Sequence, residues 1–184
     1  MQRITLVGLM GSGKTTVGEA LGRRLGWRYR DNDLELLARF GANAAELADR
    51  NGVDALHAAE SAVLLDLLNE DECSVITAAA STLERPACRR ALADRAYVVW
   101  LRAKPATLAG RAAQGEARPL EKDVELQLRR QARRRHPLLE RLADLTVDTT
   151  DLDAERLADQ IARAFDERAV GRRPAAPAGL DASF

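Results

Sequence analysis

Residues 8–15 read GLMGSGKT, and they lie between an apolar run at residues 4–7 and a helical pattern that begins at residue 15. The eight letters fit G-x-x-x-x-G-K-[S/T], a glycine-rich turn that wraps phosphate groups between a strand and a helix. Its glycines allow backbone N–H groups to turn inward around phosphate oxygens, and the helix N-terminus adds a favourable dipole. The same letters would fit a turn that binds nothing, but the flanking strand and helix favour a phosphate-binding loop.

The loop carries a lysine and a threonine whose chemistry completes a nucleotide site. Lys14 supplies a positive charge for the β- and γ-phosphates, and the hydroxyl of Thr15 is placed to ligate Mg²⁺. ATP and Mg²⁺ are therefore the predicted cofactors, and Lys14 is also a predicted catalytic residue. The predicted nucleotide-binding residues of the loop are Gly11, Ser12, Gly13, Lys14, Thr15 and Thr16.

Strand-like runs alternate with helical patterns along the rest of the chain. The clearest strands are residues 75–77 and 97–101, and weaker ones lie at 27–30 and 145–147. Apolar runs of this kind are typical of strands buried on both faces, so the alternation predicts a mostly parallel α/β sheet with helices on both sides. Helices are expected at residues 15–25, 34–40, 44–50, 53–69, 83–93, 106–113, 124–135 and 154–168.

The length and composition favour one globular domain with a small-molecule partner. Among the 184 residues we expect a single domain at 1–170 and a disordered tail at 171–184, which is rich in Pro, Gly and Ala. The 28 Lys and Arg residues balance 28 Asp and Glu residues, which argues against nucleic acid or membrane partners. No apolar segment approaches ~18 residues, and Cys73 and Cys88 lack the spacing of a metal or redox site. We expect a cytoplasmic monomer.

Two aspartates follow the weak strand at residues 27–30, at the edge where open α/β sheets bind ligands. Asp31 and Asp33 are two residues apart, so their side chains would point the same way in an extended segment. One carboxylate can hold a water on Mg²⁺ while the other accepts the proton of an acceptor hydroxyl. An alternative is that Asp33 or Asn32 caps the next helix, and both roles can coexist.

Several motifs, taken in order, resemble those of the shikimate kinases. They are GLMGSGKTTVG at residues 8–18, the Asp-x-Asp pair, ARPL at 117–120, an arginine before HPLL, and VDTT at 147–150. The similarity spans residues 3–168. It implies a three-layer α/β P-loop fold like that of the nucleoside monophosphate kinases, with a five-stranded parallel sheet flanked by helices and a lid near residues 114–123. The implied activity is transfer of the γ-phosphate of ATP to shikimate, which gives shikimate 3-phosphate.

The resemblance assigns roles to three residues whose types suit phosphoryl transfer. It makes Asp31 the aspartate associated with Mg²⁺, and Asp33 the base that contacts the substrate hydroxyls. It makes Arg118 the catalytic lid arginine that also contacts the nucleotide. A mobile arginine suits this reaction because negative charge spreads over the γ-oxygens and water must be excluded.

Two further assignments concern the two ends of the site. By the same resemblance, Arg135 holds the substrate carboxylate, and Thr149 and Thr150 lie in the adenine-side loop. Arg135 belongs to the run RRQARRRH, whose other arginines we expect to be solvated or paired with carboxylates such as Glu125.

The acceptor side departs from the family pattern at three alanines. Ala78, Ala79 and Ala80 stand where the family has three glycines. Their methyl groups would narrow the pocket, and a positive φ at any of them would cost roughly 1 kcal/mol. The alternative is that the backbone here simply begins a helix.

A histidine is the second departure. His57 stands where the family has an arginine, and it lacks the planar fork that binds a carboxylate through two hydrogen bonds, although Glu60 is kept. His57 could equally be a plain histidine on a helix surface. The predicted substrate-binding residues are Asp33, His57, Ala78, Ala79, Ala80 and Arg135.

These departures leave two other functions open. A kinase for a different, less acidic hydroxylated molecule would explain both changes. A nucleotide-binding paralogue with impaired catalysis would need only the phosphate-binding loop. Asp31, Asp33 and Arg118 argue against the paralogue, because a sensor needs neither an acceptor base nor a lid arginine.

Overall fold

The computed structural model describes residues 2–114, 123–151 and 153–171. Arg118 and most of the predicted lid lie outside the described residues, as does nearly all of the predicted tail. Among the described helices, none is both long and apolar enough to span a bilayer.

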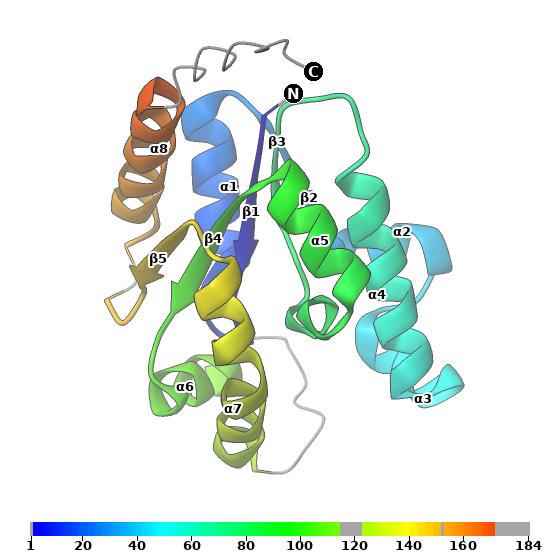
Figure 1. Ribbon diagram of the computed structural model, residues 1–184. Coiled ribbons are helices and arrows are strands. Elements are labelled where there is room, and N and C mark those ends of the chain that lie inside the picture. Colours follow the sequence, from blue (N-terminus) through cyan, green and yellow to red (C-terminus); the bar gives the residue numbers. More distant parts are fainter. Residues whose placement is uncertain (1, 115–122, 152, 172–184) are drawn as a thin grey trace, which may run out of the picture.

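Five parallel strands form a single sheet, as predicted, and their order is β2-β3-β1-β4-β5 (Figure 1). The central strand β1 pairs with both neighbours, so that Leu6 lies opposite Thr77 on one side and Val99 on the other. Such strands offer both faces to covering layers, which explains their apolar runs. The strands are β1 Arg3–Val7, β2 Arg28–Asp31, β3 Ser74–Thr77, β4 Tyr97–Arg102 and β5 Leu145–Asp148.

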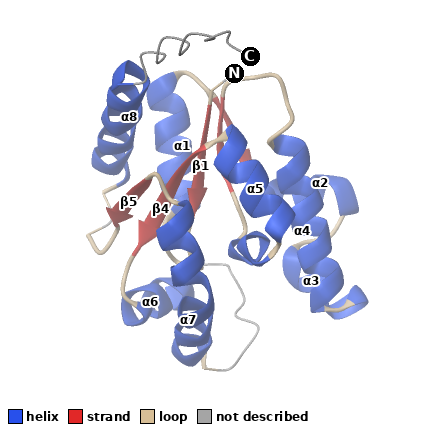
Figure 2. Ribbon diagram, in the orientation of Figure 1, coloured by secondary structure: helices blue, strands red, loops and turns tan. Residues whose placement is uncertain are grey.

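Helices cover both faces of the sheet and complete three layers (Figure 2). Helices α1 and α8 pack together on one face, and α4, α5 and α7 lie on the other. The α-helices are α1 Lys14–Leu25, α2 Asn32–Phe40, α3 Ala44–Asn51, α4 Val53–Leu67, α5 Pro86–Arg95, α6 Pro105–Gln114, α7 Val124–Leu142 and α8 Ala154–Gly171. A short 3₁₀-helix, η1 Ala80–Glu84, follows β3.

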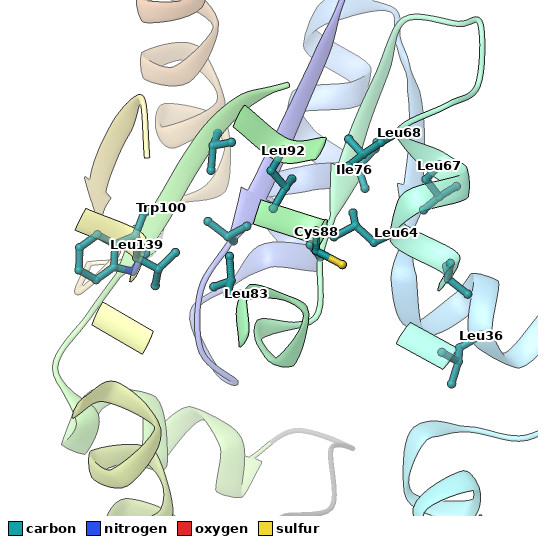
Figure 3. Packing of buried hydrophobic residues seen from close by; sticks show 14 of the residues in the cluster. Leu36, Leu64, Leu67, Leu68, Ile76, Leu83, Cys88, Leu92, Trp100 and Leu139 are labelled. Carbon is teal, nitrogen blue, oxygen red and sulfur yellow. The ribbon is translucent and has the colours of Figure 1, made fainter. Parts of the chain in front are cut away.

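Neighbouring residues of the central strands β1, β3 and β4 fill two different cores, one on each face of the sheet. In β4, Val99 and Leu101 pack toward α1 and α8, whereas Val98 and Trp100 pack toward the opposite helices. Figure 3 shows the core between the sheet and helices α4, α5 and α7, in which Leu139 of α7 lies near Trp100. Because side chains alternate across a strand, each apolar run fixes two helical layers at once.

Two predicted helices differ from those observed. The helix expected at 83–93 is divided into η1 and α5 at Arg85, which has φ −90° and ψ 120°. The residue before a proline avoids helical angles, and Pro86 begins α5. The helix expected at 124–135 instead continues to Leu142 through Pro137, because Leu139 is buried in the core. Tertiary packing there outweighs the local cost of proline.

The topology places all candidate loops at one edge of the sheet. After β1 the chain crosses to β2 on one side, and after β3 it crosses to β4 on the other side of β1. The carboxyl end of β1 is therefore the switch point at which open α/β sheets bind ligands. In Figure 1 this end lies toward α6 and α7.

Candidate active site

The phosphate-binding loop depends on glycines whose backbone no other residue adopts easily. Gly11 and Gly13 have φ of 77° and 86°, in the left-handed region. A Cβ at Gly11 would lie 2.5 Å from the carbonyl oxygen of Leu108, so the loop also packs directly against α6. Within the described residues, the buried hydroxyl of Ser12 has no hydrogen-bond partner. An unsatisfied buried hydroxyl just before the N-terminus of α1 suits an oxygen-rich anion such as phosphate.

Lys14 begins α1 and folds back over the loop. Its Nζ donates to the carbonyl oxygens of Gly8 at 3.0 Å and Leu9 at 3.3 Å. Burial lowers the pKa of this amine, while the charges of Asp33 and Asp31 act in the opposite direction. The lysine is therefore held above the loop by weak neutral acceptors that phosphate oxygens can replace with charged ones. Thr16, one residue beyond Thr15, is exposed.

Asp31 brings a second oxygen to the predicted metal position. Its Oδ2 accepts from the hydroxyl of Tyr29 at 2.6 Å and from Thr15 Oγ1 at 3.3 Å. Burial and this hydrogen bond raise the pKa of Tyr29, which stays a neutral donor. Hydroxyl and carboxylate oxygens are ligands that Mg²⁺ prefers, so the pair fits the ion. In the parts of the chain described, no three His, Cys, Asp or Glu side chains are grouped to hold a metal, so phosphate and water would supply the other ligands.

Asp31 also caps α2, which corrects two predictions. Its Oδ1 accepts from the backbone N–H groups of Asp33 at 2.8 Å and Leu34 at 3.4 Å. The helix therefore begins at Asn32, and the cap is Asp31 rather than Asp33 or Asn32. The two aspartates do not share an extended segment, because the capping carboxylate turns the backbone into a helix directly after β2.

Asp33 consequently lies in the first turn of α2, with its side chain open to solvent. Loss of part of its hydration raises its pKa, the charge of Asp31 raises it further, and Lys14 lowers it. An accessible carboxylate with a raised pKa close to Lys14 can accept a proton from an alcohol that approaches the loop.

A buried glutamate that sequence reasoning did not place in the site lies beside these groups. Glu60 of α4 is 6% exposed and accepts a hydrogen bond from Ser81 Oγ of η1. Burial raises its pKa to about 7, and the charge of Asp33 adds to this, while Ser81, Arg135 and Lys14 oppose it. The sequence signal was its position three residues after His57, where this chain keeps the glutamate of the family pattern.

His57 faces the same group of charges. Its side chain is half-buried rather than fully on the surface. Burial lowers its pKa, the charge of Arg135 lowers it further, and Glu84 and Asp54 oppose these effects. The histidine is therefore mostly neutral at neutral pH and does not supply the positive charge of an arginine.

The three alanines adopt ordinary backbone angles, so the strain considered for them does not arise. Ala79 has φ −62° and ψ 136°, and Ala80 begins η1. The backbone N–H of Ala78 donates to the carbonyl oxygen of Leu6 at 3.0 Å, which extends the pairing of β1 with β3. The chain turns directly from a strand into a 3₁₀-helix, a path that needs no glycine.

Arg135 is buried on α7 and already has two partners. Its Nε donates to Glu84 Oε1 at 2.9 Å, and its Nη1 donates to Gln131 Oε1 at 3.0 Å. The exposed Arg129 pairs with Glu125 one turn away, as expected for this arginine-rich run. Arg135 thus differs from Arg129 in its burial and in its position near the phosphate-binding loop, where burial lowers the pKa of Lys14 and the charge of Arg135 adds to this effect.

The predicted adenine-side threonines are held by an arginine that the sequence did not single out. Thr149 is buried, with its N–H donating to the carbonyl oxygen of Arg102 at 2.8 Å. Arg111 Nη2 of α6 donates to the carbonyl oxygens of Thr149 and the exposed Thr150, both at 2.7 Å. Arg111 Nη1 is buried and lacks a partner among the described residues. One arginine in a helix of an arginine-rich chain gives no distinguishing sequence signal.

The sequence of the whole domain identifies its relatives. A sequence model described as "SKI: Shikimate kinase" matches residues 10–166. The chain belongs to the shikimate kinase family. It is 36% identical to a shikimate kinase of Chromobacterium violaceum over 162 residues, which cover 85% of this chain and 88% of that one. It is 33% identical to a shikimate kinase of Vibrio cholerae over 168 residues, which cover 90% and 96%.

The fold agrees with this membership. A solved shikimate kinase from Acinetobacter baumannii in complex with shikimate is similar, with a TM-score of 0.85, 28% identity, and coverage of 91% of this chain and 94% of that one. The protein is thus an enzyme of the shikimate kinase family, a family that uses ATP. The expected five-stranded parallel fold is confirmed, whereas the roles of individual residues stay predictions.

Proposed function

We propose that this shikimate kinase family member transfers the γ-phosphate of ATP to shikimate and forms shikimate 3-phosphate. Similarity to shikimate kinases over most of the chain supports this reaction. The observation that carries it is the convergence of Lys14, Asp31 and Asp33 at the carboxyl edge of the sheet, where Asp31 accepts from Thr15 of the loop helix and from the backbone N–H of Asp33. Burial lowers the pKa of Lys14, and the charges of Asp33 and Asp31 raise it against this effect. We also propose a monomer as the active unit.

The proposed mechanism divides the work among these residues. The loop amides, Ser12 and Lys14 bind the terminal phosphates of ATP, and Thr15 with Asp31 would hold Mg²⁺. When bound, Mg²⁺ neutralises charge on the phosphate oxygens. Asp33 orients the acceptor hydroxyl and takes its proton. The hydroxyl oxygen bonds to the γ-phosphorus as the bond to the β–γ bridging oxygen breaks, and ADP leaves.

The remaining predicted residues would bind the two substrates. Arg135 would hold the carboxylate of shikimate, while His57 and the three alanines Ala78–80 would line the acceptor side. Arg111, Thr149 and Thr150 would form the adenine side, because the arginine clamps both threonine carbonyls beside the loop. Arg118 would add charge over the transferring phosphate, as in the family.

Replacing Lys14 tests the phosphate-binding role. We expect Lys14→Ala to reduce shikimate-dependent ADP release by at least about 100-fold, because it removes a charge that stabilises the transferring phosphate. The measurement is a coupled assay of ADP with MgATP and shikimate. Arg24→Ala is a matched control at the other end of α1, where the exposed arginine pairs with Asp159, and it should keep full activity.

The same assay separates the open alternatives. Unchanged kinetics in Lys14→Ala would contradict the role of the loop. ADP release with another polyol but not with shikimate would favour a kinase for a different acceptor, and nucleotide binding without turnover on any polyol would favour an impaired paralogue.

A further inference from the structure

Arg135 and Glu84 form an ion pair whose two members differ in exposure. The Arg135 side chain is 7% exposed, whereas the Glu84 side chain is 36% exposed and ends η1. The pair links η1 to α7 at the base of the candidate acceptor side. A buried guanidinium cannot leave its position easily, but a partly solvated carboxylate at the end of a short helix can rotate into water.

The geometry of the guanidinium makes this pair an obstacle to a second carboxylate. Nε carries a single hydrogen, and in the structure this hydrogen is donated to Glu84 Oε1 at 2.9 Å. The two-bond face formed by Nε and Nη2 is therefore closed while Glu84 is bound. Gln131 accepts from Nη1 at 3.0 Å and holds the guanidinium plane without adding charge. An incoming carboxylate can bind through the Nε face only after Glu84 leaves.

Two arginines act on His57 at this side of the site, and of these Arg135 is buried whereas Arg85 is exposed. His57, where the family has an arginine, has its pKa lowered by burial and by Arg135. Glu60 and Asp33 are carboxyl groups. Lys14 belongs to the phosphate-binding loop, with its Nζ bonded to loop carbonyls. Arg135 is therefore the buried cation that an acidic acceptor would meet at this side of the site, and a buried guanidinium binds a carboxylate more strongly than an exposed one does.

We propose that Glu84 is a specificity-determining residue, an internal carboxylate that competes with the carboxylate of the acceptor for Arg135. This inference rests on the proposed function, in which Arg135 holds the carboxylate of shikimate. Binding of shikimate then exchanges one carboxylate for another at the same guanidinium. The exchange weakens the affinity for acidic acceptors and leaves nucleotide binding unaffected.

The test compares Glu84→Gln with the wild type in steady-state kinetics. Gln keeps the size and the acceptor oxygen but removes the charge, so the KM for shikimate should fall about threefold to tenfold. The KM for MgATP and kcat should stay within about twofold. Glu125→Gln is the matched control, because Glu125 pairs with the exposed Arg129 on the same helix at 2.7 Å, and it should change nothing.

A neutral acceptor distinguishes competition from a general loosening of the pocket. With the methyl ester of shikimate, which has no carboxylate, Glu84→Gln should leave the KM unchanged. An unchanged or raised KM for shikimate, or an equal gain with the ester, would overturn the proposal. If Glu84→Gln does not fold, Glu84→Ala gives the same decision, because it also removes the competing carboxylate and should lower the shikimate KM in the same direction.

Calorimetric titration of shikimate in the presence of ADP separates this inference from the proposed function. If the wild type releases no ADP with shikimate, the proposed function fails. Tighter shikimate binding by Glu84→Gln than by the wild type would still support competition at Arg135. Equal, weaker or undetectable binding by the variant would overturn it.

Discussion

At the scale of the residue, Glu60 is a titratable group buried among charges from three helices. It accepts from Ser81 and lies near Asp33 of α2, Arg135 of α7 and Lys14 of α1. Burial raises its pKa from 4.5 to about 7, so the folded protein binds this proton more tightly than the unfolded chain does. The protonated form contributes stability fully below pH 4.5, and the contribution is lost as the pH rises through about 7.

This linkage predicts a pH-dependent difference between the wild type and Glu60→Gln. The free energy of unfolding of the wild type should fall relative to that of the variant by about 2–3 kcal/mol between pH 4.5 and 8. Gln can still accept the Ser81 hydrogen bond but does not ionise, so other titrating groups cancel in the comparison. Urea unfolding of both proteins at several pH values measures the difference. Parallel pH profiles would show that the Glu60 carboxyl has an ordinary pKa.

At the scale of the element, the turn from β3 into η1 forms with alanines where the family has glycines. Thr82 closes the turn, because its N–H and its hydroxyl both donate to the carbonyl oxygen of Ala79, at 3.1 Å and 2.6 Å. Ala78 lies in the core with 1% of its surface exposed. The alanines therefore restrict the backbone of this turn more than glycines would, and the methyl group of Ala78 fills space in the core.

Glycine at these three positions should destabilise the protein. Each Ala→Gly change in an ordinary backbone conformation costs about 0.5–1 kcal/mol, and loss of the buried methyl group of Ala78 adds about 1 kcal/mol. We expect the triple variant to lose about 2–4 kcal/mol in urea unfolding, with Ala78→Gly the most harmful single change. Ala79→Gly, in the extended part of the turn, serves as the internal control for backbone entropy alone. A gain in stability would mean that the native turn requires a positive φ.

At the scale of the whole molecule, a nucleotide that binds only the folded state stabilises the entire domain. ATP with Mg²⁺ at about 100 times its Kd adds about 2.7 kcal/mol, which corresponds to a rise in Tm of about 5–10 °C for a chain of this size. Thermal melts with and without MgATP measure this shift. Lys14→Ala should lose most of it and Arg24→Ala should keep it, and no shift in the wild type would contradict nucleotide binding.

Much of this molecule follows from local sequence patterns. The phosphate-binding turn, the five strands and the parallel α/β class were predictable, because a glycine pattern and apolar runs act over a few neighbouring residues. The division at Arg85 could also have been predicted from the sequence, since Pro86 restricts the backbone of the residue before it. The continuation of α7 through Pro137 was not, because it depends on burial of Leu139 against strands far away in the chain.

The sequence by itself determined that the chain is a P-loop protein of parallel α/β type, with two aspartates beside the loop. Only the tertiary structure decided which charged and polar side chains pair with one another on the acceptor side. Glu60 meets Ser81 across 21 positions and Arg135 meets Glu84 across 51, after the sheet has brought α4, η1 and α7 together. Pairs so far apart in the chain produce no periodic pattern in the sequence. The packing of helices on the sheet determines which charged side chains meet, and local backbone preference does not.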